Sequence, residues 1–162
     1  MKYICVLLAL MSSCASKETG DIKAADLNRR LKNTVIHPDS FEASIGGFLG
    51  ESYRVELQSE GTLVYLHNSQ TFTSGPGTEK SQIKVTGEQW REFRKALDAA
   101  SVWNWKEEYT DHGVHDGTQW HLRIKYSDAS IYSHGSNNSP SKRQYERYLK
   151  AVVTLLGGRK FQ

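Results

Sequence analysis

The chain has 162 residues with a formal net charge of +3 at pH 7, and 38% of its residues are hydrophobic. This length and composition suffice for one hydrophobic core, and so small a net charge does not indicate a nucleic-acid partner. The two cysteines, Cys5 and Cys14, both lie near the N-terminus, so no disulfide framework is expected in the rest of the chain.

The first residues have the pattern of a secretion signal. Lys2 supplies a positive charge, and a short apolar run over residues 3–11 follows it. The run has roughly half of the ~20 residues that a transmembrane helix needs, so a signal peptide over residues 1–13 is predicted instead of a membrane span.

Residues 11–14, Met-Ser-Ser-Cys, resemble the lipobox of bacterial lipoproteins, with methionine where leucine is usual. The resemblance implies cleavage before Cys14, a diacylglycerol thioether on that cysteine and acylation of its new amino group, as with palmitate. Such acyl chains hold a protein on a membrane without a transmembrane helix. The alternative is an ordinary signal peptide cut near Ala15. Because Ala15 stands where an aspartate would signal inner-membrane retention, the expected location is the cell envelope, at the outer membrane facing the periplasm.

The mature chain is expected to consist of a polar tether, residues 14–25, and a single domain, residues 26–162. Loss of Lys2 with the signal would leave 20 basic and 18 acidic side chains, a balance of +2. This balance again gives no indication of nucleic-acid binding. The domain is predicted to begin with a short helix around Leu27 and Leu31, which ends before Pro38.

Residues 40–68 are predicted to form antiparallel strands. Glycines between residues 46 and 50 interrupt the pattern, and Glu60-Gly61 predicts a tight two-residue hairpin turn. This turn places one face of the hairpin in the core and the other in solvent. The residues expected on the core face are Val55, Leu57, Val64 and Leu66. The residues expected to point outward are Arg54, Glu56, Gln58 and His67.

A polar loop over residues 70–80 and a short strand over 81–85 precede the first amphipathic helix. Thr86 and Gln89 form a predicted capping box at its start. The predicted buried stripe consists of Trp90, Phe93 and Leu97. After this helix, Trp103 and Trp105 are expected to lie on one side of an extended stretch and to pack under the sheet.

A second hairpin, residues 118–136, has the clearest strand pattern of the chain. Its predicted inward residues are Trp120, Leu122, Ile124 and Tyr126. The last helix is expected to have Ser139 as its cap, Pro140 at its first position and Gly157-Gly158 at its end. The predicted fold class is therefore α+β, an antiparallel sheet of about five to six strands, with two hairpins, and two amphipathic helices packed on one face.

The two helical segments have similar sequences, QWREFRKAL and QYERYLKAV, and each follows a hairpin. This similarity is consistent with a duplicated hairpin-plus-helix unit. Convergence of two amphipathic helices that lie under one sheet explains it equally well.

Residues 111–121, DHGVHDGTQWH, are a candidate metal site because they hold three histidines and two aspartates. Zinc could take His112 and His115 if Asp116 or His121 folded back toward them. However, two histidines three residues apart in a loop share no fixed face, so the spacing is weak evidence. The favoured interpretation is that Asp116-Gly117 forms a turn before the second hairpin, and no bound metal or other cofactor is expected.

The outer face of the second hairpin is the candidate binding surface. Basic and aromatic side chains of the kind enriched at interfaces are expected to alternate there. These residues are His121, Arg123, Lys125, Tyr132 and His134. An ordinary solvated sheet face is the competing interpretation, because the exposed side of any antiparallel sheet is polar.

No catalytic constellation emerges from the sequence. The glycine-rich residues 46–50 lack the lysine and hydroxyl residue of a P-loop, and no G-x-S-x-G nucleophile motif occurs. The predicted function is therefore non-enzymatic binding of an envelope protein, a peptide or a glycan. One alternative is a periplasmic inhibitor or immunity-type protein that projects the loop 71–80 into a target, and another is a metal-assisted hydrolase built on residues 111–121.

Five short motifs in fixed order, GGFLG, SEGTLVYL, a tryptophan-containing helix, DGTQW and GSNNSP, resemble a class of small bacterial secreted and lipoprotein domains of unknown function. The resemblance covers roughly residues 41–156. It implies a fold and an envelope location, and no activity. It also implies structural roles for the residues that fall on the pattern, which are Asp116, Gly117, Trp120, Asn137 and Pro140.

Overall fold

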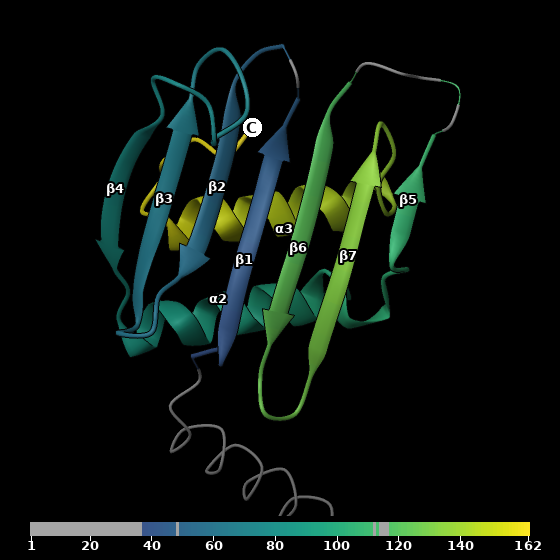
Figure 1. Ribbon diagram of the computed structural model, residues 1–162. Coiled ribbons are helices and arrows are strands. Elements are labelled where there is room, and N and C mark those ends of the chain that lie inside the picture. Colours follow the sequence, from purple (N-terminus) through teal and green to yellow (C-terminus); the bar gives the residue numbers. More distant parts are fainter. Residues whose placement is uncertain (1–36, 48, 112, 114–116) are drawn as a thin grey trace, which may run out of the picture. The chain divides into compact units, whose positions relative to one another are not determined.

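The fold is a seven-stranded sheet that carries two helices on one of its faces (Figure 1). The computed structural model describes residues 37–47, 49–111, 113 and 117–162, within a unit that spans Ile36–Gln162. The predicted signal peptide, Cys14, the tether and the helix around Leu27 and Leu31 lie outside the described residues.

Along the described part of the chain, four strands are followed by two helices, three more strands and a last helix. The strands are β1 (Ser40–Gly46), β2 (Ser52–Leu57), β3 (Thr62–Asn68), β4 (Glu79–Lys84), β5 (Glu108–Thr110), β6 (Gln119–Lys125) and β7 (Ser130–Ser136). The helices are α2 (Gly87–Ala99), the 3-10 helix η1 (Val102–Asn104) and α3 (Lys142–Leu155).

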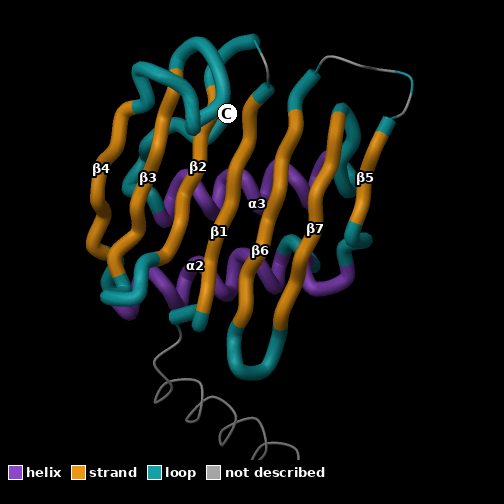
Figure 2. The backbone as a smooth tube through the Cα atoms, in the orientation of Figure 1, coloured by secondary structure: helices purple, strands orange, loops and turns teal. Residues whose placement is uncertain are grey.

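The strand order is β4-β3-β2-β1-β6-β7-β5, so the N-terminal strand β1 joins the two hairpins at the centre (Figure 2). The general α+β class is as predicted, but the prediction of five to six antiparallel strands is wrong. The sheet is mixed, because β5 runs parallel to β7. β5 has only three residues, Glu-Tyr-Thr, which are too few to show a strand alternation in the sequence.

The β2–β3 hairpin also corrects the sequence prediction. Its loop has three residues, Ser59–Gly61, because the Gln58 N–H donates to the Thr62 carbonyl at 2.9 Å and Gly61 adopts a φ of +79°. This is the type I turn with a left-handed glycine that three-residue hairpin loops favour.

A loop longer by one residue turns every side chain of β3 to the opposite face. Leu57 therefore lies opposite Leu63, and Val55 lies opposite Tyr65, so these four share the core face. Val64 and Leu66 lie opposite Glu56 and Arg54 on the other face. His67, which was expected to point outward, stacks on the buried Tyr53 ring at a centroid distance of 5.0 Å.

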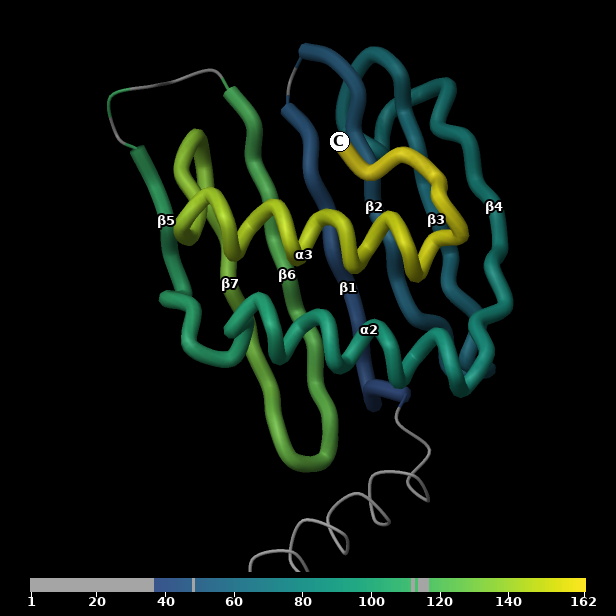
Figure 3. The backbone as a smooth tube through the Cα atoms, turned by 180° about the vertical axis from the view of Figure 1, so that it is seen from behind, coloured from purple at the N-terminus to yellow at the C-terminus, as the bar shows by residue number. Residues whose placement is uncertain are grey.

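Both helices lie across one face of the sheet, side by side and in opposite directions (Figure 3). α2 begins with the predicted capping box, in which Thr86 Oγ1 accepts from the Gln89 N–H and Gln89 Oε1 accepts from the Thr86 N–H. The predicted stripe is confirmed, since its three residues are buried. Burial of each such large side chain contributes about 1.5–3 kcal/mol. The stripe consists of Trp90, Phe93 and Leu97.

The start of α3 and the tryptophan segment differ from the prediction. α3 begins at Lys142 with Ser141 as its N-cap residue, because residues 137–140 belong to a turn that packs against the start of β6. Trp103 lies in η1 and not in an extended stretch, while Trp105 just after it is buried against Trp120 and Tyr148, as expected for packing under the sheet.

The end of α3 is as predicted. Gly157 and Gly158 have φ angles of +68° and +86°, and the Gly158 N–H donates to the Val153 carbonyl at 2.9 Å. The chain then turns back, so that Phe161 is buried with 1% exposure against Tyr53. The Tyr65 hydroxyl donates to the Lys160 carbonyl at 2.7 Å and holds this tail in place.

The two ends of the sheet carry different features (Figure 1). The described domain begins next to Asp39, at the end where β1 starts. Gly46, at the other end of β1, lies about 20 Å away, since a strand rises about 3.4 Å per residue. The β1–β2 loop, the β3–β4 loop and the C-terminus all lie at this far end.

Candidate functional site

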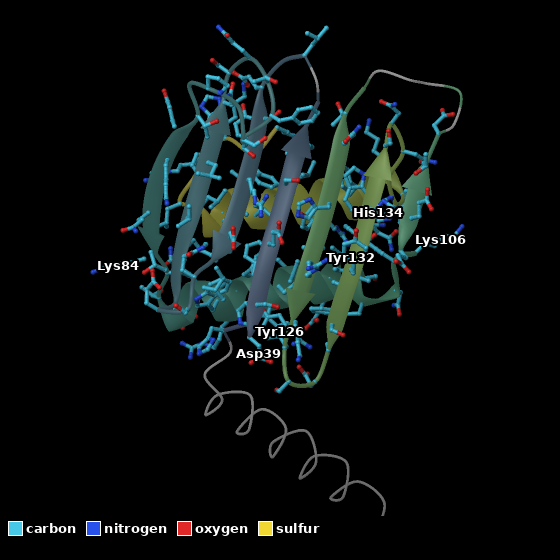
Figure 4. All side chains as sticks on the ribbon, in the orientation of Figure 1. Asp39, Lys84, Lys106, Tyr126, Tyr132 and His134 are labelled. Carbon is cyan, nitrogen blue, oxygen red and sulfur yellow. The ribbon has the colours of Figure 1, made fainter. Side chains whose placement is uncertain are left out.

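The outer face of the sheet, which no described helix covers, holds all five predicted binding residues. His121 on β6 lies opposite His134 on β7, and Arg123 lies opposite Tyr132. Lys125 ends the row opposite Ser130. Figure 4 shows Tyr132 and His134 on β7 on the face turned to the reader. The alternation predicted for β6 is confirmed, because Trp120, Leu122 and Ile124 between these positions are buried.

His121 is the centre of a polar network that crosses three strands. Ser44 Oγ on β1 lies 2.7 Å from His121 Nδ1, and Glu42 Oε1 lies 3.1 Å from His121 Nε2. The same Glu42 oxygen lies 2.7 Å from Arg54 Nη2 on β2. Glu42 and Arg54 therefore form an ion pair next to the imidazole.

The Glu42 carboxylate determines which ring nitrogen of His121 carries the proton. Because an ionised carboxylate only accepts hydrogen bonds, the neutral ring carries its proton on Nε2 and accepts the Ser44 hydroxyl proton on Nδ1. Burial lowers the pKa of His121, although Glu42 acts in the opposite direction. His121 is therefore a neutral, oriented ring at neutral pH.

Ser44, His121 and Glu42 are connected in the order serine, histidine, carboxylate, as in a hydrolase triad. This arrangement was not predicted from the sequence. It lacks two features that such chemistry needs. Ser44 lies within β1, whose main-chain groups pair with β2 and β6, so they offer no oxyanion site. Glu42 is neutralised by Arg54. The geometry instead fits a network that fixes the position of His121.

A second group of side chains lies beside this network. The guanidinium of Arg123 lies over the Tyr132 ring, 5.0 Å from its centroid. His134 lies two residues further along β7 on the same face, and its ring centroid is 5.5 Å from that of Tyr132. The cation–π contact engages the positive charge of Arg123 with an aromatic ring and leaves Tyr132 42% exposed.

A hollow of about 350 Å³ lies between the two groups, toward the end of the sheet that is farthest from Asp39. We call it the outer-face hollow. Its side-chain lining comes from four strands and from the β3–β4 loop. The lining includes Ser44, Phe72, Thr73, Gln119, His121, Tyr132, His134 and Ser136.

The β3–β4 loop forms one wall of the outer-face hollow, and Asn68 gives this loop its shape. Asn68 Oδ1 accepts from the N–H groups of Gln70 and Thr71, while Asn68 Nδ2 donates to the Pro76 carbonyl at 3.0 Å. Asn68 itself is 2% exposed. The loop that was considered as an inhibitory projection is thus tied to a buried side chain, and it places Phe72 at the hollow.

Hollows elsewhere among the described residues have a different character. A groove of about 620 Å³ runs between α2 and α3, with Ala96 and Ala151 along it, Glu88 at one end and Arg147 at the other. A wider hollow of about 770 Å³ lies at the far end of the sheet beside Leu49 and Glu51. Neither contains any of the predicted binding residues, and neither gathers as many neutral hydrogen-bonding groups as the outer-face hollow.

The candidate metal loop is only partly described. His112, His115 and Asp116 lie outside the described residues. Elsewhere in the described ranges, no group of three or more potential metal ligands comes together. His121, the remaining member of the segment, bonds to Ser44 and Glu42 on the outer face.

Three of the residues with predicted structural roles, Gly117, Trp120 and Asn137, lie where β6 begins and β7 ends, while Asp116 lies outside the described residues. The Asn137 N–H donates to the Thr118 carbonyl at 2.9 Å, and Trp120 Nε1 donates to the Asn138 carbonyl at 2.8 Å. A Cβ atom at Gly117 would lie 1.6 Å from the Asn137 side chain. A larger residue at position 117 would therefore force the Asn137 side chain to move.

No protein-family model matches the chain, and no curated protein is significantly similar to it. The resemblance to bacterial lipoproteins and small secreted domains stays a prediction from the motifs. None of the helices in the described part of the chain is both long enough and apolar enough to span a membrane.

Proposed function

We propose that the protein is a lipid-anchored binding module of the bacterial cell envelope, and that the outer-face hollow is its ligand site. The observation that carries the proposal is the hollow itself. It gathers His121, Tyr132 and His134, three of the five residues that the sequence indicates as a binding surface, on the face without helices.

The described domain begins beside Asp39, and the hollow lies toward the opposite end of the sheet. Attachment to the outer membrane through Cys14, facing the periplasm, is part of the proposal.

Ligand binding is favoured over catalysis by the same geometry. The outer face offers an oriented neutral imidazole, but its Ser44 has no oxyanion site in the surrounding strands. An inhibitor that acts through the β3–β4 loop is also less well supported, because Asn68 ties that loop to the domain.

The anchoring is tested by membrane fractionation and palmitate labelling of the full chain beside the variant Cys14→Ser. The full chain should sediment with membranes and incorporate the label, and Cys14→Ser should do neither. An unlabelled full chain that is released into the soluble fraction would contradict the anchor and leave the ligand site untouched.

The binding site is tested by cross-linking and pull-down from solubilised envelopes, with a tag after Gln162. The double variant Tyr132→Ala/His134→Ala should lose the species that the wild-type chain captures. The matched control is Lys84→Ala on the edge strand β4, which should capture the same species as the wild type. Equal capture by all three chains would show that the hollow is not the site.

A further inference from the structure

The chemistry of the outer-face hollow indicates what kind of ligand it takes. Its described lining contains no aspartate, glutamate, lysine or arginine. Among the charged groups beside the hollow, Arg54 pairs with Glu42, Arg123 lies over Tyr132, and Glu108, opposite His134, accepts from the Thr110 hydroxyl. An ionic ligand would therefore find no free counter-charge in the hollow, and burial of an unpaired charge is costly.

The hollow is rich in neutral groups that can form hydrogen bonds. No side-chain hydrogen bond to another part of the described protein involves Gln119, Tyr132, His134, Ser136 or Thr73. Together they offer an amide, a phenol, an imidazole and two hydroxyls, which both donate and accept hydrogen bonds. A ligand that carries several hydroxyl groups, each of them a donor and an acceptor, matches this set.

The two aromatic rings of the lining complete the match. Phe72 and Tyr132 are 40% and 42% exposed, and both contribute to the hollow. The C–H groups of a sugar ring form an apolar face that packs on an aromatic ring, while its hydroxyls point to the sides. A volume of about 350 Å³ lies at the lower end of the range for small-ligand sites, which is about 300–1,000 Å³.

A peptide fits the same hollow less well. Extended peptides bind to sheets by pairing with an open strand edge. Of the strands that form the floor of the hollow, β1 and β6 pair with a neighbour on both sides, and β5 pairs with β7 from His134 to Ser136, which is the part of β7 that contributes most of its lining residues. The open edges of the sheet are β4, which carries Lys80 and Lys84, and β5, which has only three residues. Lysines and very short edge strands are both typical of edges protected against pairing with another chain.

We propose that the outer-face hollow binds a neutral saccharide, of one or a few sugar units. This inference rests on the proposed function, because it names the ligand class of the same site. Phe72 and Tyr132 supply the stacking surfaces, and Gln119, His134 and Ser136 supply hydrogen bonds to the hydroxyl groups.

The test is a titration of the isotope-labelled domain, observed by the amide resonances, with three classes of probe at millimolar concentration. The neutral probes are maltotriose and triacetylchitotriose, the charged probe is trigalacturonic acid, and the peptide probe is tri-alanine. At least one neutral saccharide should shift the resonances of Gln119, His121 and His134, while the charged sugar and the peptide shift them much less.

Two variants locate the effect. Tyr132→Ala should weaken saccharide binding by about ten-fold, which is the effect of removing a stacking ring with about 1.4 kcal/mol of interaction. The matched control is Lys84→Ala on the edge strand β4, outside the hollow, which should bind like the wild type.

Shifts at the hollow that come only from the peptide or the charged sugar would overturn the saccharide inference and leave the binding site intact. The absence of shifts from every probe would also overturn it. The capture experiment then decides the proposed function separately, because loss of captured species in Tyr132→Ala/His134→Ala would keep the site even without a saccharide ligand.

Discussion

The two faces of the sheet use the same strands for different purposes. On the helix side, β1 and β6 contribute side chains that are almost fully buried, including Phe41 and Leu122 at 1% and 0% exposure. On the outer side, the same two strands contribute Glu42, Ser44 and His121, which bond to one another across the strands.

The difference shows where stability and specificity come from in this fold. The helix-side face contributes through burial, which depends on apolar area and packing. The outer face contributes little burial, and its order comes from hydrogen bonds and ion pairs between neighbouring strands. A residue change should therefore affect unfolding on the first face and ligand binding on the second.

The largest contrast is expected between Phe93→Ala and Tyr132→Ala. Phe93 is 2% exposed and packs on Phe41 at a ring distance of 5.2 Å, so its removal should cost about 3–5 kcal/mol of unfolding free energy. Tyr132→Ala should cost about 1 kcal/mol or less, since it loses mainly the contact with Arg123. Urea unfolding of both variants measures the difference, and equal losses would contradict the division between the faces.

A smaller loss, about 2 kcal/mol, is expected for Gly135→Ala. A Cβ atom at this position would lie 2.5 Å from both the Asn138 carbonyl oxygen and Trp120 Nε1, which are held by their own hydrogen bond. The control is Gly87→Ala at the start of α2, where a Cβ atom meets nothing within 4 Å. Thermal unfolding should show a lower melting temperature only for Gly135→Ala.

The pH dependence of stability should be sensitive to His121. Its folded pKa is lowered by burial, so the unfolded chain binds a proton first as the pH falls below about 6.5. Stability from this group is complete above that pH and decreases between the unfolded and the folded pKa. The urea midpoint of His121→Gln should therefore fall less than that of the wild type between about pH 7 and pH 5, and an identical slope would show that His121 is not responsible.

The smallest effect is expected for Tyr148→Phe. The Tyr148 hydroxyl is buried without a hydrogen-bond partner in the described part of the protein, and burial raises its pKa well above the ordinary value. Removal of an unsatisfied polar group should leave stability unchanged or raise it by up to about 1 kcal/mol. Calorimetry of Tyr148→Phe and of Tyr148→Ala, which also removes the buried ring, separates the effect of the hydroxyl on stability from the effect of ring packing. A clear loss in Tyr148→Phe would reveal a partner for the hydroxyl.

Features that depend on a local sequence pattern could be predicted from the sequence. The capping box at Thr86 and Gln89, the stripe on α2, the alternation in β6 and the stop at Gly157-Gly158 all follow from short-range spacing. β5 was missed because three residues cannot show a period, and the β3 faces were reversed by one extra loop residue.

The candidate site depends on pairing that spans the whole chain. Ser44 and His121 are 77 residues apart in the sequence, and they meet only because β1 lies between the two hairpins. The sequence indicated His121, Tyr132 and His134, which alternate on one hairpin. It gave no signal for Ser44, Glu42 or Phe72, whose places follow from the strand order and from the loop that Asn68 shapes.

The most direct test of the central claim compares the two faces of the molecule in intact cells. The photoreactive amino acid p-benzoylphenylalanine is placed at position 132, in the outer-face hollow, or at position 92, in the groove between α2 and α3. We expect a cross-linked product after irradiation from position 132 and none from position 92. A product from position 92 alone would show that the helix side is the binding surface, and the assignment of the outer-face hollow would be wrong.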